Sequence, residues 1–454
     1  MEYFEEDNAS KSFNIKPWLK LGRFFKPYSK KLAGIVAFML ITATMDLSIP
    51  LFQKYAVDNF IVPRTTEGIE RFIAVYAIAL IITTVAVTVF ARLAIVVEMH
   101  IGKDLREEIF LHLQKLSLSY YNTTPVGYIM ARTVSDTNKI GSMIAWGIVD
   151  VFWSFAYVIG AFGAMFMLNF RLALIVALVV PAMALITLYF QKKLLVTSRS
   201  LRKINSRITG NFNEGITGAR TSKTLVIEHR NLKGFKNLSS EMNFSAVKMA
   251  KLNAIYIPLI VFLGSAASSV VLARGGQLAL NQVIQIGTLS AFLSYAVNIF
   301  DPIQNLARTY TDIVSLQVNI ERVTELLEME PLIKDREDVI EKYGDNIHPR
   351  KENWEPIEGE IEFRNVSFKY PDGDEEILKD FNLHIKPGTN VAIVGETGAG
   401  KSTLVNLACR FFEPTKGHIL IDGTEYRERS QLWLHSNIGY VLQDPHLFSG
   451  TIRE

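Results

Sequence analysis

The distribution of apolar residues constrains this chain most, because six stretches are long enough to cross a bilayer as helices. A crossing helix needs about 20 mostly apolar residues. A single stretch of this kind could be a buried helix of a soluble protein, but six predict an all-α polytopic membrane domain. The stretches lie at about residues 32–52, 72–97, 144–168, 172–190, 252–273 and 283–300.

Lysine and arginine residues predict how these crossings are oriented. If the N-terminus is cytoplasmic, the inner segments 1–31, 98–143 and 191–251 hold 25 basic residues, and the outer segments hold 5. Basic residues concentrate in cytoplasmic loops of membrane proteins. We therefore expect a multi-pass protein of the cell membrane, with cytoplasmic N- and C-termini.

Two inner segments are long and carry a helical pattern of their own. In the 98–143 segment, Leu105, Ile109 and Leu113 recur at helical spacing. The crossing helices should therefore continue into the cytoplasm as long extensions. Within residues 1–31, aromatic and basic residues alternate over 15–26, which predicts an elbow helix lying in the membrane interface. A plain basic flank of the first crossing is the alternative.

The composition changes after the sixth crossing, which divides the chain into domains. The membrane domain is expected over 32–326, and the charged, proline-containing segment 327–358 is expected to be a linker. From residue 359 the pattern alternates as in strands, and the apolar run Val391–Val394 predicts a buried strand. Residues 359–454 are thus interpreted as part of a separate α/β domain.

The segment Gly395–Ser402 matches the pattern G-x-x-x-x-G-K-[ST], which marks a phosphate-binding loop. Glycines let the backbone wrap around phosphates so that its N–H groups point inward. The Lys401 ammonium should neutralise the β- and γ-phosphates, and the Ser402 hydroxyl should bind Mg²⁺. A helix predicted over 402–412 directs its positive end at the anion. The expected cofactors are ATP and Mg²⁺.

With six crossings upstream of this loop, the chain resembles a half-transporter of the ATP-binding cassette (ABC) exporter family. The resemblance rests also on Tyr370, 25 residues before the loop, and on Gln443, 42 residues after Lys401. It implies that Tyr370 stacks on adenine and that Gln443 contacts Mg²⁺ or the attacking water. It also implies a second half-transporter, identical or different, as partner. The nucleotide-binding residues it implies are Tyr370, Gly395, Glu396, Thr397, Gly398, Ala399, Gly400, Lys401, Ser402, Thr403 and Gln443, with Ser402 and Gln443 on the metal.

The inner segments add to the resemblance. Residues 121–127, followed by Arg132 and Asp136, resemble the first coupling segment of the family, and residues 213–218 resemble the second. In the family such segments press on the ATP-binding domains and transmit their closure. Ordinary helix-capping and turn residues are the alternative interpretation.

The family's signature loop, catalytic glutamate and switch histidine are not found within residues 1–454, so no complete catalytic set is present. We expect these parts to follow in a longer protein, and we expect residues 1–454 alone to be unable to hydrolyse ATP. Two short runs imitate the missing parts. Residues 273–277 imitate the signature but are expected in an outer loop, and residues 419–422 imitate the acidic strand but are expected in a peripheral β-region.

The resemblance predicts an exporter that moves amphipathic, drug-like molecules out of the cytoplasm by alternating access. A lipid or peptide exporter, and a non-transporting relative in which ATP binding only gates a channel, are the alternatives. Asp46 and Asp150 lie within predicted crossings and would either contact cationic substrates or pair with nearby donors. The net charge of +3 gives no indication of a nucleic-acid partner.

Overall fold

The computed structural model describes residues 15–371, 373, 375–442 and 447–451. These residues form two compact units, which we describe separately. The membrane unit contains residues up to 106 together with residues 134–324. The cassette unit contains residues 107–133 and the chain from residue 325 onward.

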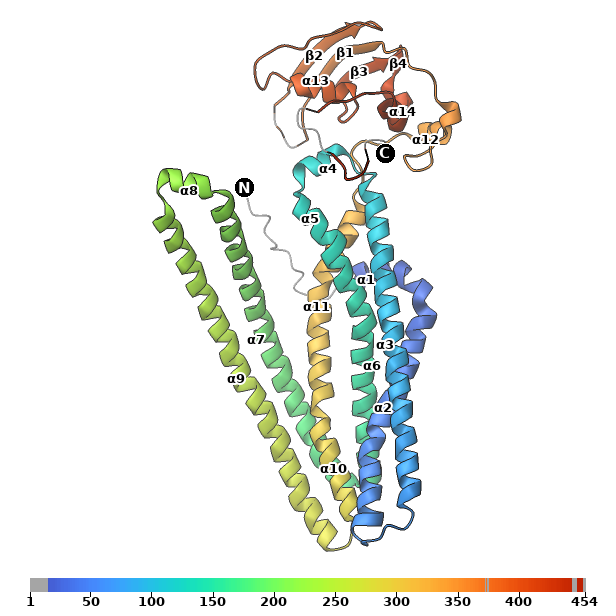
Figure 1. The fold of residues 1–454 in the computed structure, drawn as a ribbon, viewed down its shortest axis with the longest axis vertical. Coiled ribbons are helices and arrows are strands. Elements are labelled where there is room, and N and C mark those ends of the chain that lie inside the picture. Colours follow the sequence, from blue (N-terminus) through green and yellow to red (C-terminus); the bar gives the residue numbers. More distant parts are fainter. Residues whose placement is uncertain (1–14, 372, 374, 443–446, 452–454) are drawn as a thin grey trace. The chain divides into compact units, whose positions relative to one another are not determined.

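Long helices form almost all of the membrane unit (Figure 1). An apolar chain segment in lipid can satisfy its backbone N–H and C=O groups within a helix, which favours this structure for each crossing. Six helical stretches are long and apolar enough to cross a membrane. The helices in chain order are α1 (Ile15–Phe25), α2 (Ser29–Ala56), α3 (Ile69–Leu113), α6 (Thr137–Leu168), α7 (Phe170–Thr217), α8 (Ala219–Leu225), α9 (Glu228–Leu280), α10 (Ile286–Asn298) and α11 (Phe300–Glu328).

The predicted crossings and their extensions are confirmed. The six stretches run for 43 to 53 residues, about twice what a bilayer requires. The segment expected as an elbow forms α1, an amphipathic helix that ends before the first crossing. Residues 213–217 form the last turn of α7, and Gly218 joins this helix to α8.

One expectation about the outer loops is wrong. The run 273–277 was expected in a loop, but α9 continues through it to Leu280. Arg274 and two glycines lower the hydropathy there without breaking the helix. The backbone turns only at residues 281–285 before α10 begins.

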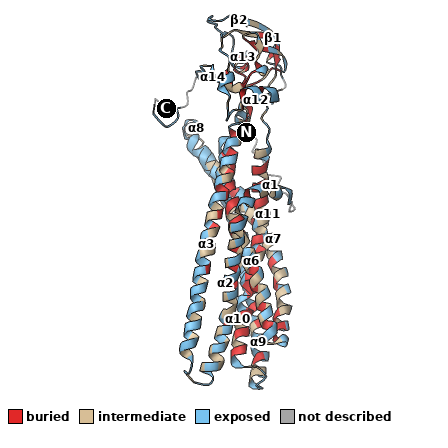
Figure 2. Cartoon of the chain, turned by 90° about the vertical axis from the view of Figure 1, so that its right-hand side faces the viewer, coloured by how far each residue is buried: buried red, intermediate tan, exposed pale blue. Residues whose placement is uncertain are grey.

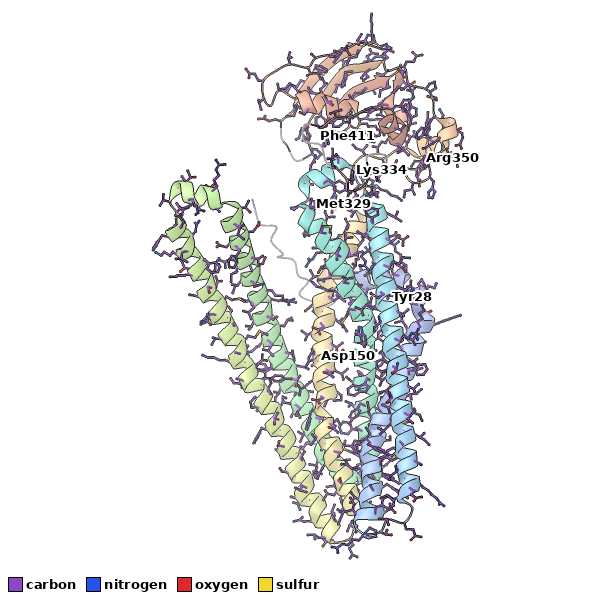
Figure 3. The ribbon with its side chains drawn as sticks, in the orientation of Figure 1. Tyr28, Asp150, Met329, Lys334, Arg350 and Phe411 are labelled. Atoms are coloured by element: carbon purple, nitrogen blue, oxygen red, sulfur yellow. The ribbon has the colours of Figure 1, made fainter. Side chains whose placement is uncertain are left out.

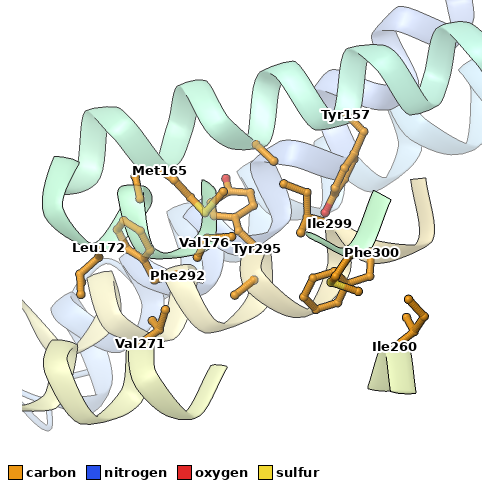
Figure 4. Packing of buried hydrophobic residues seen from close by; sticks show 14 of the residues in the cluster. Tyr157, Met165, Leu172, Val176, Ile260, Val271, Phe292, Tyr295, Ile299 and Phe300 are labelled. Carbon is orange, nitrogen blue, oxygen red and sulfur yellow. The ribbon is translucent and has the colours of Figure 1, made fainter. Parts of the chain in front are cut away.

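The core of the membrane unit lies where α6, α7, α9 and α10 pack together (Figure 4). Tyr157, Phe292 and Tyr295 are almost fully buried in it. Close helix approach depends on small residues, as is common in membrane bundles. A Cβ on Gly141 of α6 would lie 2.9 Å from the Glu98 carbonyl oxygen of α3, which only glycine avoids. By contrast, Figure 2 shows α3 exposed along much of its length, as expected of a lipid-facing helix.

The cassette unit is built on a four-stranded antiparallel sheet of order β2-β1-β3-β4. Phe363, Leu407 and Trp433 lie in the core that the sheet shares with the helices packed on it. Its strands are β1 (Ile361–Phe368), β2 (Leu378–Ile385), β3 (Lys416–Ile421) and β4 (Thr424–Glu425), and its helices include α4 (Leu118–Thr123), α5 (Val126–Met130), α12 (Glu337–Tyr343), α13 (Lys401–Ala408) and α14 (Gln431–Ser436).

The predicted first strand is confirmed as β1, with an irregularity that its sequence conceals. Phe363 and Val366 are both buried. In a regular strand, side chains three positions apart would point to opposite faces of the sheet. A bulge lies between them, and Asn365 adopts a left-handed conformation with φ 50°. A bulge inserts one residue and so returns the next side chain to the same face.

The predicted strand Val391–Val394 is not formed. Its residues lack strand geometry, and Val391, Ile393 and Val394 are exposed. A buried parallel strand exists only where neighbouring strands hydrogen-bond to it. None of the strands in the described residues pairs with this run.

Candidate nucleotide-binding site

The glycine-rich segment 395–400 forms an exposed turn that leads into α13. Gly398 and Gly400 have φ angles of 89° and 87°, a conformation that L side chains rarely adopt. A Cβ on Gly400 would also lie 3.0 Å from Cγ2 of Ile377. The two glycines therefore allow the backbone to curl back over the start of α13.

Lys401 is held across this turn. Its Nζ donates to the carbonyl oxygens of Gly395 at 2.8 Å and Glu396 at 2.6 Å. The helix that begins at Lys401 leaves its first N–H groups without helical acceptors, and its dipole favours an anion at this end. An ammonium group and the first backbone N–H groups of a helix thus lie at a single exposed turn, an arrangement typical of a phosphate-binding loop.

Ser402 is exposed on the first turn of α13, where its hydroxyl can reach a metal ion bound to phosphate. The helix is shorter than the predicted range 402–412. It begins one residue earlier and ends at Ala408, because Arg410 adopts a left-handed conformation with φ 56° just after the cap residue Cys409. Burial raises the pKa of the Cys409 thiol, so this side chain stays protonated at neutral pH.

Tyr370 lies beside the first turn of α13. Its hydroxyl shares a hydrogen bond of 3.0 Å with the hydroxyl of Thr403 on α13. Its ring also contacts the rings of Phe368 and Phe412. Thr403 is buried, and its hydroxyl holds Tyr370 in position through this bond. Gln443 lies outside the described residues.

Asp422, at the end of β3, uses its carboxylate to bind backbone N–H groups. Its carboxylate accepts backbone N–H groups of Glu358, Gly359 and Glu360 at 2.8–2.9 Å. It follows β3 and has φ 47°, a conformation that aspartate tolerates. The run 419–422 forms the end of strand β3 and the start of a turn, and this carboxylate ties the strand end to the segment before β1.

A buried arginine, which the sequence reasoning did not identify, connects the predicted linker to the cassette. Arg410 is 1% exposed, and its Nη1 donates to Asp335 Oδ1 at 2.9 Å. Its Nε donates to Glu413, and Nη1 also donates to the Arg429 carbonyl. An arginine inside the apolar run 407–412 was the available indication, since a buried charge is tolerated only when it is paired.

A second feature lies in the membrane unit, where an open cavity of about 360 Å³ is lined by residues of α6, α7 and α11. Asp150, labelled in Figure 3, lines it. Asp46, the other predicted carboxylate, instead accepts the indole N–H of Trp153 at 3.1 Å. The charged residues of the cavity are Lys139, Asp150, Arg202 and Asp312, and its apolar residues include Met143, Trp146 and Leu316.

Comparison with known families covers both units. The model of the ABC transporter transmembrane region matches residues 32–303, and the model of the ABC transporter cassette matches residues 378–454. The first match alone covers more than half of the chain. The chain belongs to the ABC transporter family. The membrane match together with the six apolar helices makes this ABC transporter a multi-pass membrane protein.

Curated relatives resemble the ABC transporter over most of its length. The putative multidrug export ATP-binding/permease protein YgaD of Bacillus subtilis (strain 168) is 28% identical over 95% of this chain and 73% of its own length. A putative multidrug export ATP-binding/permease protein of Staphylococcus aureus (strain NCTC 8325 / PS 47) is 30% identical over 97% of this chain and 75% of its own. The probable multidrug resistance ABC transporter protein YheH of B. subtilis is 32% identical over 77% of this chain and 50% of its own.

Proposed function

We propose that this ABC transporter is an ATP-driven exporter that moves amphipathic, drug-like molecules out of the cytoplasm by alternating access. One observation carries the proposal: a phosphate cradle formed by the 395–400 turn and Lys401 belongs to the same chain as a six-helix ABC membrane region. The named relatives, two of which are called multidrug export proteins, support the substrate class.

ATP and Mg²⁺ are the cofactors of this proposal. The backbone N–H groups of 395–403 and the Lys401 ammonium would hold the phosphates, and Tyr370 would lie against the adenine. Mg²⁺ would be held by Ser402 and the phosphates, with Gln443 as the second protein contact. Bound Mg²⁺ would neutralise charge that develops on the phosphates. Lys401 would exchange its two carbonyl partners for phosphate oxygens.

A second half-transporter is the proposed partner, and the charges on the membrane unit support it. Asp150 and Asp301 are exposed in the single chain, although both lie at or near predicted crossings. Charged side chains facing lipid are costly, so such residues normally face a water-filled cavity or a protein partner. Two copies, or two different halves, would enclose these charges. The cytoplasmic placement of both termini follows from the basic inner segments.

The cavity beside Asp150 is the proposed contact for substrates. Apolar side chains such as Trp146 and Met143 would take the apolar part of an amphipathic molecule, and the charged residues would take its polar part. We also propose that residues 1–454 by themselves bind ATP weakly and do not hydrolyse it. Hydrolysis needs a group that orients water and further charge stabilisation in addition to this cradle.

The test compares Lys401→Ala with Lys386→Ala in the full-length protein. Lys386 is an exposed lysine of the same cassette and serves as the matched control. Each charge-assisted bond to phosphate contributes about tenfold in affinity, so Lys401→Ala should weaken ATP binding at least about tenfold. It should also abolish ATP hydrolysis and ATP-dependent uptake of an amphipathic dye into inverted vesicles. Equal activity of both variants would contradict the proposal.

A further inference from the structure

The segment Met329–Asp335, which we call the linker strap, joins the end of α11 to the cassette. Figure 3 labels Met329 and Lys334 on it. It lacks helix or strand structure, yet both of its ends are bonded to other parts of the cassette unit. A segment that is bonded at both ends moves one attachment point when the other moves, whereas a loosely attached linker does not.

The cassette end of the linker strap is fastened by a buried ion pair. Asp335 accepts Arg410 Nη1 at 2.9 Å, and its two carboxylate oxygens accept the Gln431 backbone N–H at 3.2 and 3.0 Å. The side chains of Arg410 and Asp335 are 1% and 8% exposed. Removing one partner of a buried pair leaves an uncompensated charge, so this contact is hard to break and geometrically defined.

The other end of the linker strap is fastened to the end of α3 and the start of α4. The Ile333 N–H donates to Ser117 Oγ at 3.0 Å, and a ring nitrogen of His112 lies 3.0 Å from the Met329 carbonyl oxygen. Ser117 occupies the N-cap position of α4, but its hydroxyl makes no capping bond. The hydroxyl serves the strap instead of the helix it precedes.

The same arginine is close in sequence to the phosphate cradle. The helix α13 begins at Lys401, whose ammonium spans the turn, and Arg410 lies two residues beyond its end at Ala408. A helix of eight residues with packed Leu404 and Leu407 moves as a rigid piece. A shift at the phosphate end of α13 would therefore displace Arg410 and, through its bond to Asp335, the linker strap.

We infer that the linker strap couples nucleotide occupancy of the 395–403 turn to the α3–α4 turn, with Arg410 and Asp335 as the positioning pair. This inference rests on the proposed function. The path runs from α13 through Arg410, Asp335 and Ile333 to Ser117. Neither Asp335 nor Ser117 touches the phosphate cradle, so the path predicts variants that bind ATP normally but fail to transmit the event.

The test uses Asp335→Asn in the full-length protein, with Asp338→Asn as matched control. Asp338 is three residues away and exposed, and it pairs with Arg336, which is also exposed. Asp335→Asn should leave the ATP dissociation constant within about twofold and reduce the substrate-stimulated part of ATP hydrolysis at least about fivefold. The number of substrate molecules moved per ATP should fall with it. Asp338→Asn should match the unsubstituted protein in all three quantities.

Ser117→Ala provides the second variant, because it removes the bond between Ile333 of the strap and the residue before α4, and it leaves the buried pair intact. It should reproduce the coupling loss in smaller measure, with an unchanged melting temperature. Hydrogen exchange of the Ile333 amide gives a readout that needs no transport. Nucleotide should change its exchange rate at least about threefold in the unsubstituted protein and less than about twofold in Asp335→Asn.

The outcomes separate the two proposals. If the unsubstituted protein neither hydrolyses ATP nor transports, the proposed function fails, and the Ile333 exchange still decides the strap. If the unsubstituted protein is active and folded Asp335→Asn keeps its coupling, the strap inference is overturned. Loss of ATP binding in Asp335→Asn would also overturn it, since the residue would then act on the cradle itself.

Discussion

Two regions of the cassette bury their residues in opposite ways. We call the region around Arg410, Tyr426 and Trp433 the linker side, and the run Val391–Val394 with the 395–400 turn the phosphate side. On the linker side, Arg410, Tyr426 and Trp433 are almost fully buried, and their polar groups are hydrogen-bonded. On the phosphate side, Val391 and Val394, which lead into the 395–400 turn, are 50% and 88% exposed. Polar groups are therefore buried on one side, and apolar side chains are exposed on the other.

The difference separates the parts that fix geometry from the parts that remain adaptable. A buried and satisfied polar network specifies one arrangement, because each group that loses its partner incurs a desolvation cost. An exposed turn with two left-handed glycines has few such constraints. The linker side would hold the position of α13, while the turn at its other end would, in the proposed function, exchange the backbone carbonyls bound by Lys401 for phosphate.

The comparison predicts the largest loss of stability on the linker side. Arg410→Ala should destabilise the cassette by about 3–5 kcal/mol, because it leaves the buried Asp335 carboxylate without its guanidinium and takes from Glu413 one of its two arginine partners. In residues 1–454, Val394→Ala, on the phosphate side, should change stability by about 0.5 kcal/mol or less.

Denaturant titration followed by the fluorescence of buried Trp433 would compare the two variants with the unsubstituted protein. If Val394→Ala shifted the unfolding midpoint as much as Arg410→Ala, the phosphate side would contribute to stability as much as the linker side. That result would show the exposed run to be packed in solution, and the contrast between the two sides would disappear.

A smaller effect is expected at Asp422, which lies between these extremes in burial. Asp422→Ala should cost about 1–2 kcal/mol, because three backbone N–H groups lose their acceptor in a partly exposed position. Asp422→Asn keeps an acceptor oxygen and tolerates the left-handed backbone, so it should cost about half as much. ATP hydrolysis should be unchanged in folded Asp422→Asn, and its abolition would instead indicate a metal-binding carboxylate.

The sequence predicted the helices well because their indications are local. Apolar length and helical spacing are properties of consecutive residues, so α1 and the six long stretches could be located without knowing their neighbours. The end of α9 was missed for the same reason: low hydropathy at Arg274 marks a more polar position, while the backbone continues as a helix to Leu280.

Predictions that depended on distant partners were less successful. The run Val391–Val394 has the composition of a buried strand, but strands require partners that composition does not reveal. The pairing of Arg410 with Asp335 joins positions 75 residues apart. The phosphate turn could be predicted because its bonds are local: Lys401 reaches carbonyls only five and six residues away.

The smallest effect is expected where the two sides meet, at Tyr370. Tyr370→Phe removes the hydrogen bond to Thr403 but keeps a ring that packs against Phe368 and Phe412. If the ring carries the contact with adenine, ATP affinity should change by less than about threefold, in line with a hydrogen bond of about 0.5–1.5 kcal/mol that acts only indirectly. Tyr370→Ala removes the ring and should weaken binding about tenfold, since aromatic stacking on a base contributes about 1–3 kcal/mol. Titration with a fluorescent ATP analogue measures both variants. Equal losses in the two would assign the role to the hydroxyl and its bond to α13, which would make Tyr370 part of the fixed side of the cassette.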